Sequence, residues 1–216
     1  MEFNLVQQIA IWALPVIFAI TVHEAAHGWM ANRLGDATAR EQGRLTLNPI
    51  KHIDPVGTVL VPLAMMVLTS FVFGWAKPVP VNYQRLRNPQ RDMVWVALAG
   101  PASNFVMAIF WALMMKAGLM LLSSYPWLAT PLVLMGEAGI LINLILMVLN
   151  LLPIPPLDGG RIVTGLLPPS LAQGYARIEP YGLIILVVLL VTGVLGQLLF
   201  PIIITLRNLL RGLAGL

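Results

Sequence analysis

The chain has 216 residues, of which 58% are hydrophobic and only 10% are charged. Soluble domains carry roughly 25% charged residues, so this composition excludes a soluble protein, which could not bury so much apolar surface. It predicts an all-α polytopic membrane protein, with about 4–6 transmembrane or re-entrant helices in a single integral-membrane domain, residues 1–216. The net charge of +4 comes from basic residues beside apolar segments, which set membrane topology rather than bind nucleic acid. Because the chain has no cysteine, disulfides and thiolate metal ligands are excluded.

Six apolar stretches divide the chain. A spanning helix needs roughly 20 apolar residues, and the first, third, fourth and sixth stretches are long enough. The second stretch is borderline, and the fifth is too short and is bracketed by prolines. In chain order the stretches are residues 5–31, 56–75, 93–122, 132–152, 157–167 and 181–206.

Two basic linkers, residues 32–55 and 76–92, flank the second stretch. The positive-inside rule places both linkers in the cytoplasm, but they cannot share a side of the membrane if residues 56–75 cross it once. Gly57 and Pro62 favour a bent or re-entrant path for that stretch. Either the stretch dips into the bilayer and returns, or one basic linker lies on the opposite side.

Two segments of these linkers have the pattern of extended backbone. Residues 43–49 alternate polar and apolar side chains, which predicts a short strand or β-hairpin. Residues 77–82 are predicted to be extended, because each proline disfavours helix at the residue before it. Residues 43–49 or 78–82 could therefore pair with another extended chain by β-addition.

The first apolar stretch contains two histidines and a glutamate in the pattern H-E-x-x-H, at His23, Glu24 and His27. On a helix, His23 and His27 lie on one face, where two imidazoles can chelate one Zn²⁺. Glu24 can then act as general base on a water molecule. A five-residue match can arise by chance, but the chain has only three histidines and two of them are here. The pattern therefore predicts a zinc site at membrane depth.

A catalytic zinc site needs a third protein ligand, and Asp158 is the strongest candidate. Prolines after Asn150 end one helix, and Asp158 opens the next short one, as expected of a broken helix that lines a polar cavity. An alternative role for Asp158 is to cap that short helix. Glu137 and His52 are the rival ligands, although Glu137 fits an interfacial or paired role better and His52 lies in a polar loop.

Two asparagines are candidates for stabilising an oxyanion. An amide N–H can donate to the negative charge that develops during hydrolysis, and Asn150 and Asn104 both lie in or beside apolar stretches. Either amide could instead bond a neighbouring helix, a role that Asn143, on the same helix face as Asn150, could share. For Asn150 the two interpretations are balanced, and for Asn104 the structural one leads.

Together these residues resemble the site-2 protease family of intramembrane zinc metalloproteases. The resemblance rests on the H-E-x-x-H pattern, on Gly100-Pro-Ala-Ser-Asn104, and on Asn150-x-x-Pro-x-Pro-x-Leu-Asp-Gly159. It implies one Zn²⁺ per chain, held by His23, His27 and Asp158, with Glu24 as base and acid. It further implies a compact bacterial-type member of the family, with no PDZ or CBS domain, in the bacterial cytoplasmic membrane.

The predicted function is hydrolysis of peptide bonds within or near transmembrane helices. The family resemblance implies substrates with a single transmembrane helix, such as membrane-anchored regulators or signal-peptide remnants. The alternatives are a metal-binding or metal-transport protein and a non-catalytic membrane scaffold. Polar residues are too sparse to line a path across the bilayer, which weighs against transport. The intact Glu24 weighs against a scaffold, because a structural metal site needs no base.

Overall fold

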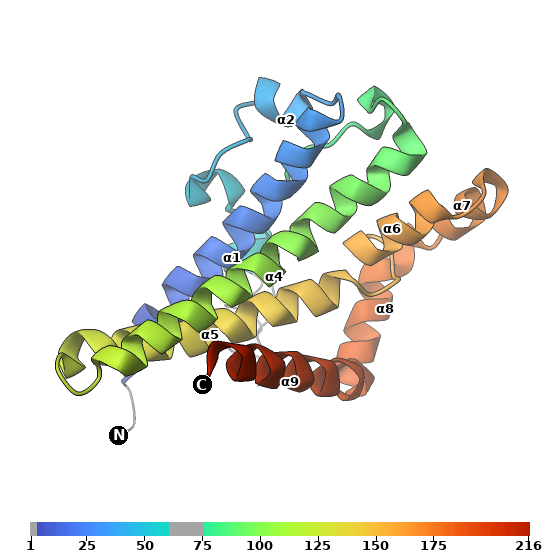
Figure 1. Cartoon of the computed structure of the whole chain (residues 1–216). Coiled ribbons are helices and arrows are strands. Elements are labelled where there is room, and N and C mark those ends of the chain that lie inside the picture. Colours follow the sequence, from blue (N-terminus) through green and yellow to red (C-terminus); the bar gives the residue numbers. More distant parts are fainter. Residues whose placement is uncertain (1–3, 61–75) are drawn as a thin grey trace.

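The computed structural model describes residues 4–60 and 76–216, and within those residues the chain is helical with no strand. The helix bundle, shown in Figure 1, is built around three long helices, α1, α4 and α5, which pack side by side. Their neighbours are shorter. The elements are α1 (Leu5–Arg33), α2 (Thr38–Glu41), η1 (Pro49–His52), η2 (Pro55–Leu60), η3 (Tyr83–Arg85), α4 (Pro89–Leu121), α5 (Pro126–Asn150), α6 (Asp158–Leu166), α7 (Pro169–Ala176), α8 (Glu179–Val191) and α9 (Val194–Ala214).

Four of the described helices, α1, α4, α5 and α9, are long and apolar enough to cross a membrane. Helices α7 and α8, bent by 58° at the break between them, could together make a fifth crossing. This agrees with the predicted range, and the chain is an integral multi-pass membrane protein with an all-α fold.

Helices α4 and α5 approach closely because α5 has glycines on the face that meets α4. A Cβ added to Gly136 would lie 2.6 Å from Cβ of Met115, and one added to Gly139 would lie 2.1 Å from the Trp111 ring. Lipid tails are as apolar as leucine, so helices in a bilayer associate through such close packing rather than through a hydrophobic driving force. The tight α4–α5 pair forms the centre of the core, to which α8 and α9 contribute side chains. Helix α1 packs against both α4 and α5.

The strand or hairpin expected at residues 43–49 does not form, so that prediction is wrong. Gly43 adopts a positive φ of 62° after α2, and the segment then bends irregularly. The Asn48 side chain accepts the N–H of Ile50 and thereby caps the 3-10 helix η1. Side-chain capping and a proline at the start of η1 outweigh the alternation of polar and apolar residues.

The sixth apolar stretch is divided between two helices rather than forming one. Helix α8 ends at Val191, and α9 begins at Val194 after Gly193, whose φ is +76°. A left-handed residue of this kind ends a helix, and glycine adopts it at no steric cost. The single crossing expected over residues 181–206 is therefore split between α8 and α9, of which α9 alone is long enough to span and α8 would need α7.

The two basic linkers lie together at the C-terminal end of α1. The Lys77 N–H donates to the His52 carbonyl at 2.9 Å, and the Arg87 N–H donates to the Leu34 carbonyl at 3.0 Å. Arg44 donates to the carbonyl of Lys77 at 3.0 Å. The described residues on either side of the second apolar stretch thus return to the same end of the bundle. The path between them, residues 61–75, lies outside the described residues.

Candidate metal centre

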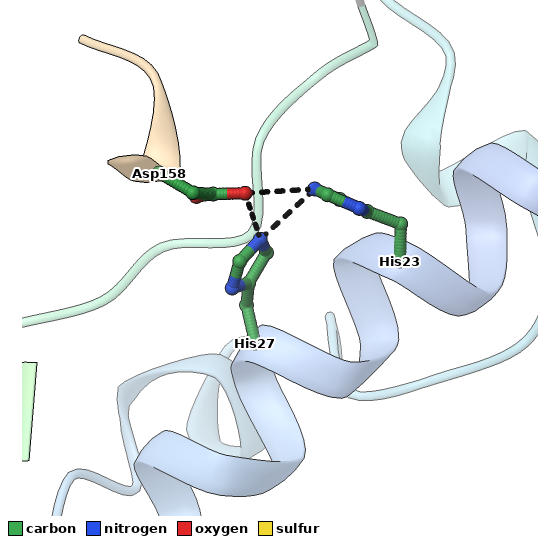
Figure 2. A group of neighbouring side chains, drawn as sticks. All are labelled: His23, His27 and Asp158. Carbon is green, nitrogen blue, oxygen red and sulfur yellow. Dashed lines mark hydrogen bonds and ion pairs between the residues drawn. The ribbon is translucent and has the colours of Figure 1, made fainter. Parts of the chain in front are cut away.

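His23 and His27 project from the same face of α1 toward Asp158 at the start of α6, as Figure 2 shows. The two Nε2 atoms are 3.0 Å apart, and Oδ2 of Asp158 is 3.3 Å from each. His27 and Asp158 are 131 residues apart in the sequence. The fold brings them together because α6 packs against α4, which in turn packs against α1.

The other nitrogen of each imidazole is fixed by helix α4. Nδ1 of His23 donates to Oδ1 of Asn104 at 2.6 Å, and Nδ1 of His27 donates to the carbonyl oxygen of Val96 at 2.7 Å. Because each Nδ1 donates a proton, each neutral ring presents the lone pair of Nε2 toward the other ligand atoms. Such hydrogen bonds orient the histidines at metal sites and raise their basicity.

Asn104 is itself fully buried and held by its neighbours. Its amide nitrogen donates to the Ala19 carbonyl at 3.2 Å and to Oδ1 of Asn143 at 2.9 Å. The amide nitrogen of Asn143 donates in turn to the Gly139 carbonyl. These bonds direct the Asn104 oxygen at His23 and use both of its N–H groups inside the bundle. The geometry favours an orienting role for Asn104 over the oxyanion role considered from the sequence.

Asp158 is the first residue of α6, after the proline-rich turn that ends α5. Leu157, not Asp158, is the N-cap residue, and no side chain caps this helix. A Cβ added to Gly159 would lie 2.3 Å from the Leu151 carbonyl oxygen, and one added to Gly160 would lie 2.4 Å from the Pro155 nitrogen. The two glycines therefore let α6 fold back against the turn, which aims Asp158 at the histidines.

The three ligand atoms fit a tetrahedral metal ion. Ligands at about 2.0–2.1 Å from Zn²⁺ lie roughly 3.3–3.4 Å from one another, close to the distances observed. The triangle consists of two imidazole lone pairs and a carboxylate, with no donor between them. Oδ2 of Asp158 is buried and has no hydrogen-bond partner among the described residues. An electron-rich group of this kind requires a cation.

The Asp158 carboxyl must lose its proton to act as a ligand. Burial raises its pKa, but the two facing imidazoles, when each carries a second proton at Nε2, outweigh burial and lower the pKa to about 2. A bound metal ion would take the place of those protons.

Gly100 is a site residue whose role the sequence did not reveal. A Cβ at this position would lie 2.3 Å from Nε2 of His27 and 2.6 Å from Cε1 of His23. Only glycine lets α4 approach both imidazoles this closely. The sequence offered one signal for this role: Gly100 is the first residue of the motif that ends at Asn104.

Glu24 lies on α1 between the two histidines and is partly buried. Its Oε2 accepts the backbone N–H of Val79 at 2.7 Å. Residues 77–82, predicted to be extended, form neither helix nor turn, and at Val79 this segment runs beside Glu24. The contact fixes one oxygen of the carboxylate, which is the arrangement expected of a positioned base.

The rival ligands lie outside this group. His52 is buried, but its Nε2 bonds the Thr46 carbonyl at 2.9 Å. Glu137 forms ion pairs with Arg207 and Arg211 of α9. The paired role for Glu137 thus holds. Asn150 donates to the Leu146 carbonyl at 3.0 Å within its own helix.

Comparison with known proteins identifies the family. Residues 128–193 match the family described as Peptidase family M50. The protein named "Putative zinc metalloprotease YwhC" of Bacillus subtilis (strain 168) is 42% identical over 192 residues, which cover 87% of this chain and 83% of that protein. The chain belongs to peptidase family M50. A second relative, named "Putative zinc metalloprotease Rip2", of Mycolicibacterium smegmatis, is 31% identical over 190 residues, which cover 87% of this chain and 69% of that protein. No solved structure matches the chain.

Peptidase family M50 is the site-2 protease family, so the resemblance inferred from the motifs is confirmed. The chain is an intramembrane metalloprotease of that family. The comparisons give no support for a transporter or a non-catalytic scaffold.

Proposed function

We propose that this M50 peptidase binds one Zn²⁺ through Nε2 of His23, Nε2 of His27 and Oδ2 of Asp158. The observation that carries the proposal is the triangle of three converging acceptors, at 3.0, 3.3 and 3.3 Å. When bound, zinc supplies Lewis acidity, which makes water nucleophilic near neutral pH and polarises a carbonyl group. Three protein ligands leave a coordination position open, as in catalytic zinc sites.

Glu24 is proposed as the general base and acid. Its Oε2 is held by the Val79 N–H, and Oε1 is the oxygen that takes a proton from the attacking water. The same carboxyl then delivers that proton to the leaving amine. Glu24 directly follows the ligand His23 on α1, which places the base beside the metal site.

Asn104 and Asn150 have different proposed roles. Asn104 keeps the His23 ring in place through its 2.6 Å contact with Nδ1. Asn150 uses one amide hydrogen on the Leu146 carbonyl, and the second is the donor that the predicted oxyanion role would use.

The proposed substrates are membrane-anchored proteins with a single transmembrane helix, including signal-peptide remnants. Such a helix satisfies its own backbone hydrogen bonds, so it must unwind before a peptide bond can reach the metal. Residues 78–82 lie beside Glu24, and the N–H groups of Val79 and Asn82 are already bonded within the fold. Pro78 and Pro80 have no N–H, so in the proposed pairing this segment would offer the unwound chain mainly carbonyl acceptors.

The proposed orientation places the zinc site toward the cytoplasmic side of a bacterial membrane. Both basic linkers lie at the C-terminal end of α1, and the positive-inside rule assigns that end to the cytoplasm. His27 lies roughly 9 Å along the helix before Arg33, so the metal ligands are nearer this end. We further propose that residues 1–216 form a single membrane domain.

Trapping in cells tests the proposed function. The wild-type chain and its Glu24→Gln variant are co-expressed with tagged single-span membrane proteins, and captured proteins and fragments are identified by mass spectrometry. The variant should retain uncut substrate, and the wild type should yield fragments ending within or next to the apolar span. Equal fragment yields from both chains would contradict the role of Glu24.

A further inference from the structure

Residues 77–82, here called the proline segment, are anchored to three parts of the fold through their backbone N–H groups. Pro78 and Pro80 have no N–H, so the segment has four such donors. The Lys77 N–H donates to the His52 carbonyl at 2.9 Å. The Val79 N–H donates to Oε2 of Glu24 at 2.7 Å, and the Asn82 N–H donates to Oδ2 of Asp36 at 2.6 Å.

Asp36 anchors the C-terminal end of the proline segment. Its carboxylate is fully buried, and it accepts both the N–H and the hydroxyl of Thr38 at Oδ1. Its other oxygen accepts the N–H of Asn82. At the opposite end, Arg44 donates to the carbonyls of Lys77 and Pro78 at 3.0 and 3.2 Å. The segment is thus fixed on both sides of Val79.

The middle of the proline segment is also packed against α1. The Val79 side chain is 6% exposed. A Cβ added to Gly28 would lie 2.9 Å from Cγ1 of Val79, so glycine at this position lets the segment lie directly on the helix. Gly28 is four residues after Glu24, one helical turn along the same face. Packing on Gly28 and the hydrogen bond to Glu24 therefore both fix the same position of the proline segment along α1.

We propose that the proline segment is a positioning element that orients Glu24 through the N–H of Val79. This inference rests on the proposed function of Glu24 as base. A hydrogen bond from a backbone donor to a carboxylate is charge-assisted and stronger than a neutral one. With Oε2 held in this way, the carboxylate keeps one orientation on α1, and Oε1 is the oxygen proposed to take the proton. A freely rotating side chain would reach that geometry only part of the time.

Hydrogen exchange tests the contact without a substrate. A peptide of residues 77–82 reports on only three amides, those of Val79, Val81 and Asn82, because the prolines have no N–H and the first residue carries an amine. Glu24→Ala removes its acceptor, so this peptide should take up about one more deuteron at short labelling times than the wild type. Glu41→Ala, which removes a surface partner of Arg85 at 2.8 Å, is the control and should change nothing in the peptide.

Catalysis tests the consequence of the contact. Val79→Pro removes the donor in a segment that is already neither helix nor turn and that has prolines on both sides of this residue, so we expect the path of the backbone to be kept. Val79→Ala is the matched control, because it truncates the same buried side chain but keeps the N–H. On a reporter that the wild type cleaves, Val79→Pro should lower kcat by roughly 10- to 100-fold relative to Val79→Ala. KM and bound zinc should be equal in the two variants.

The outcomes separate the inference from the function on which it rests. Unchanged exchange in Glu24→Ala, or equal kcat for Val79→Pro and Val79→Ala, would overturn the positioning role. If Glu24→Gln cleaves the reporter as fast as the wild type, the proposed function fails instead, whatever the exchange shows. A loss of zinc in Val79→Pro but not in Val79→Ala would mean that the segment supports the metal ligands rather than Glu24, and would also overturn the inference.

Discussion

Gly100→Ala should disrupt the metal centre while leaving the fold intact. The added Cβ would lie 2.3 Å from Nε2 of His27 and 2.5 Å from its Cε1, whereas non-bonded atoms normally approach to about 3.5–4.0 Å. Relieving this overlap requires a displacement of roughly 1 Å by the ring or by α4. Metal–ligand distances tolerate only about 0.2 Å. The shift is therefore several times larger than the centre can accept.

The expected loss of zinc affinity is at least the roughly 10- to 100-fold found when partners of metal ligands are removed. Helix stability should not fall for a local reason, because alanine is about 1 kcal/mol more favourable than glycine inside a helix. The assay is competition between the purified protein and a chelator of known affinity, with bound zinc measured by mass spectrometry. Cleavage of a reporter is measured in parallel.

Gly212→Ala is the matched control. Gly212 is also helical, but a Cβ there would meet nothing within 4 Å. This variant should keep wild-type zinc affinity and activity. If Gly100→Ala also kept both, the close approach of α4 to the imidazoles would be wrong, and so would the arrangement of ligands derived from it.

Three further variants have distinct expected outcomes. Asp158→Asn keeps the size of the side chain but removes its charge, so bound zinc should drop well below one ion per chain; full occupancy would move the third ligand elsewhere. Asn104→Ala frees Nδ1 of His23, and zinc affinity should fall by roughly 10- to 100-fold in the same chelator assay; an unchanged value would exclude the orienting role. Arg207→Ala leaves Glu137 with the more distant Arg211 as its remaining ion-pair partner among the described residues, and should lower the free energy of unfolding by about 1–3 kcal/mol in detergent, with zinc content unchanged. An unaltered unfolding midpoint would show that the pair does not hold α9 to α5.

The sequence could predict the proposed ligands, which the fold brings together, because each of them carries a local signal. Two histidines at helical spacing share a face, and an aspartate after a run of prolines opens a new helix at a place where a polar cavity can form. These signals depend only on residues that are close in the sequence, so they can be recognised before the fold is known. The helices α1, α4 and α5 were predictable for the same reason, since apolar length alone identifies a crossing.

The support for the ligands was not predictable, because it comes from tertiary contacts with no side-chain signature. The Val96 carbonyl and the Val79 N–H are backbone groups, which every residue of the chain has. Gly100 matters for the side chain that it lacks. At residues 43–49 a local signal was present but misleading. The alternation of polar and apolar side chains predicted a hairpin, and the capping of η1 outweighed it.

The most direct test of the account is cleavage by the purified, zinc-loaded chain in lipid vesicles. A single-span substrate identified by trapping is reconstituted with the wild type or with Glu24→Gln at equal zinc content, and the fragment masses are measured. The account predicts a cut within or next to the apolar span by the wild type, and none by Glu24→Gln. Fragments of the same mass and yield from both chains would contradict it.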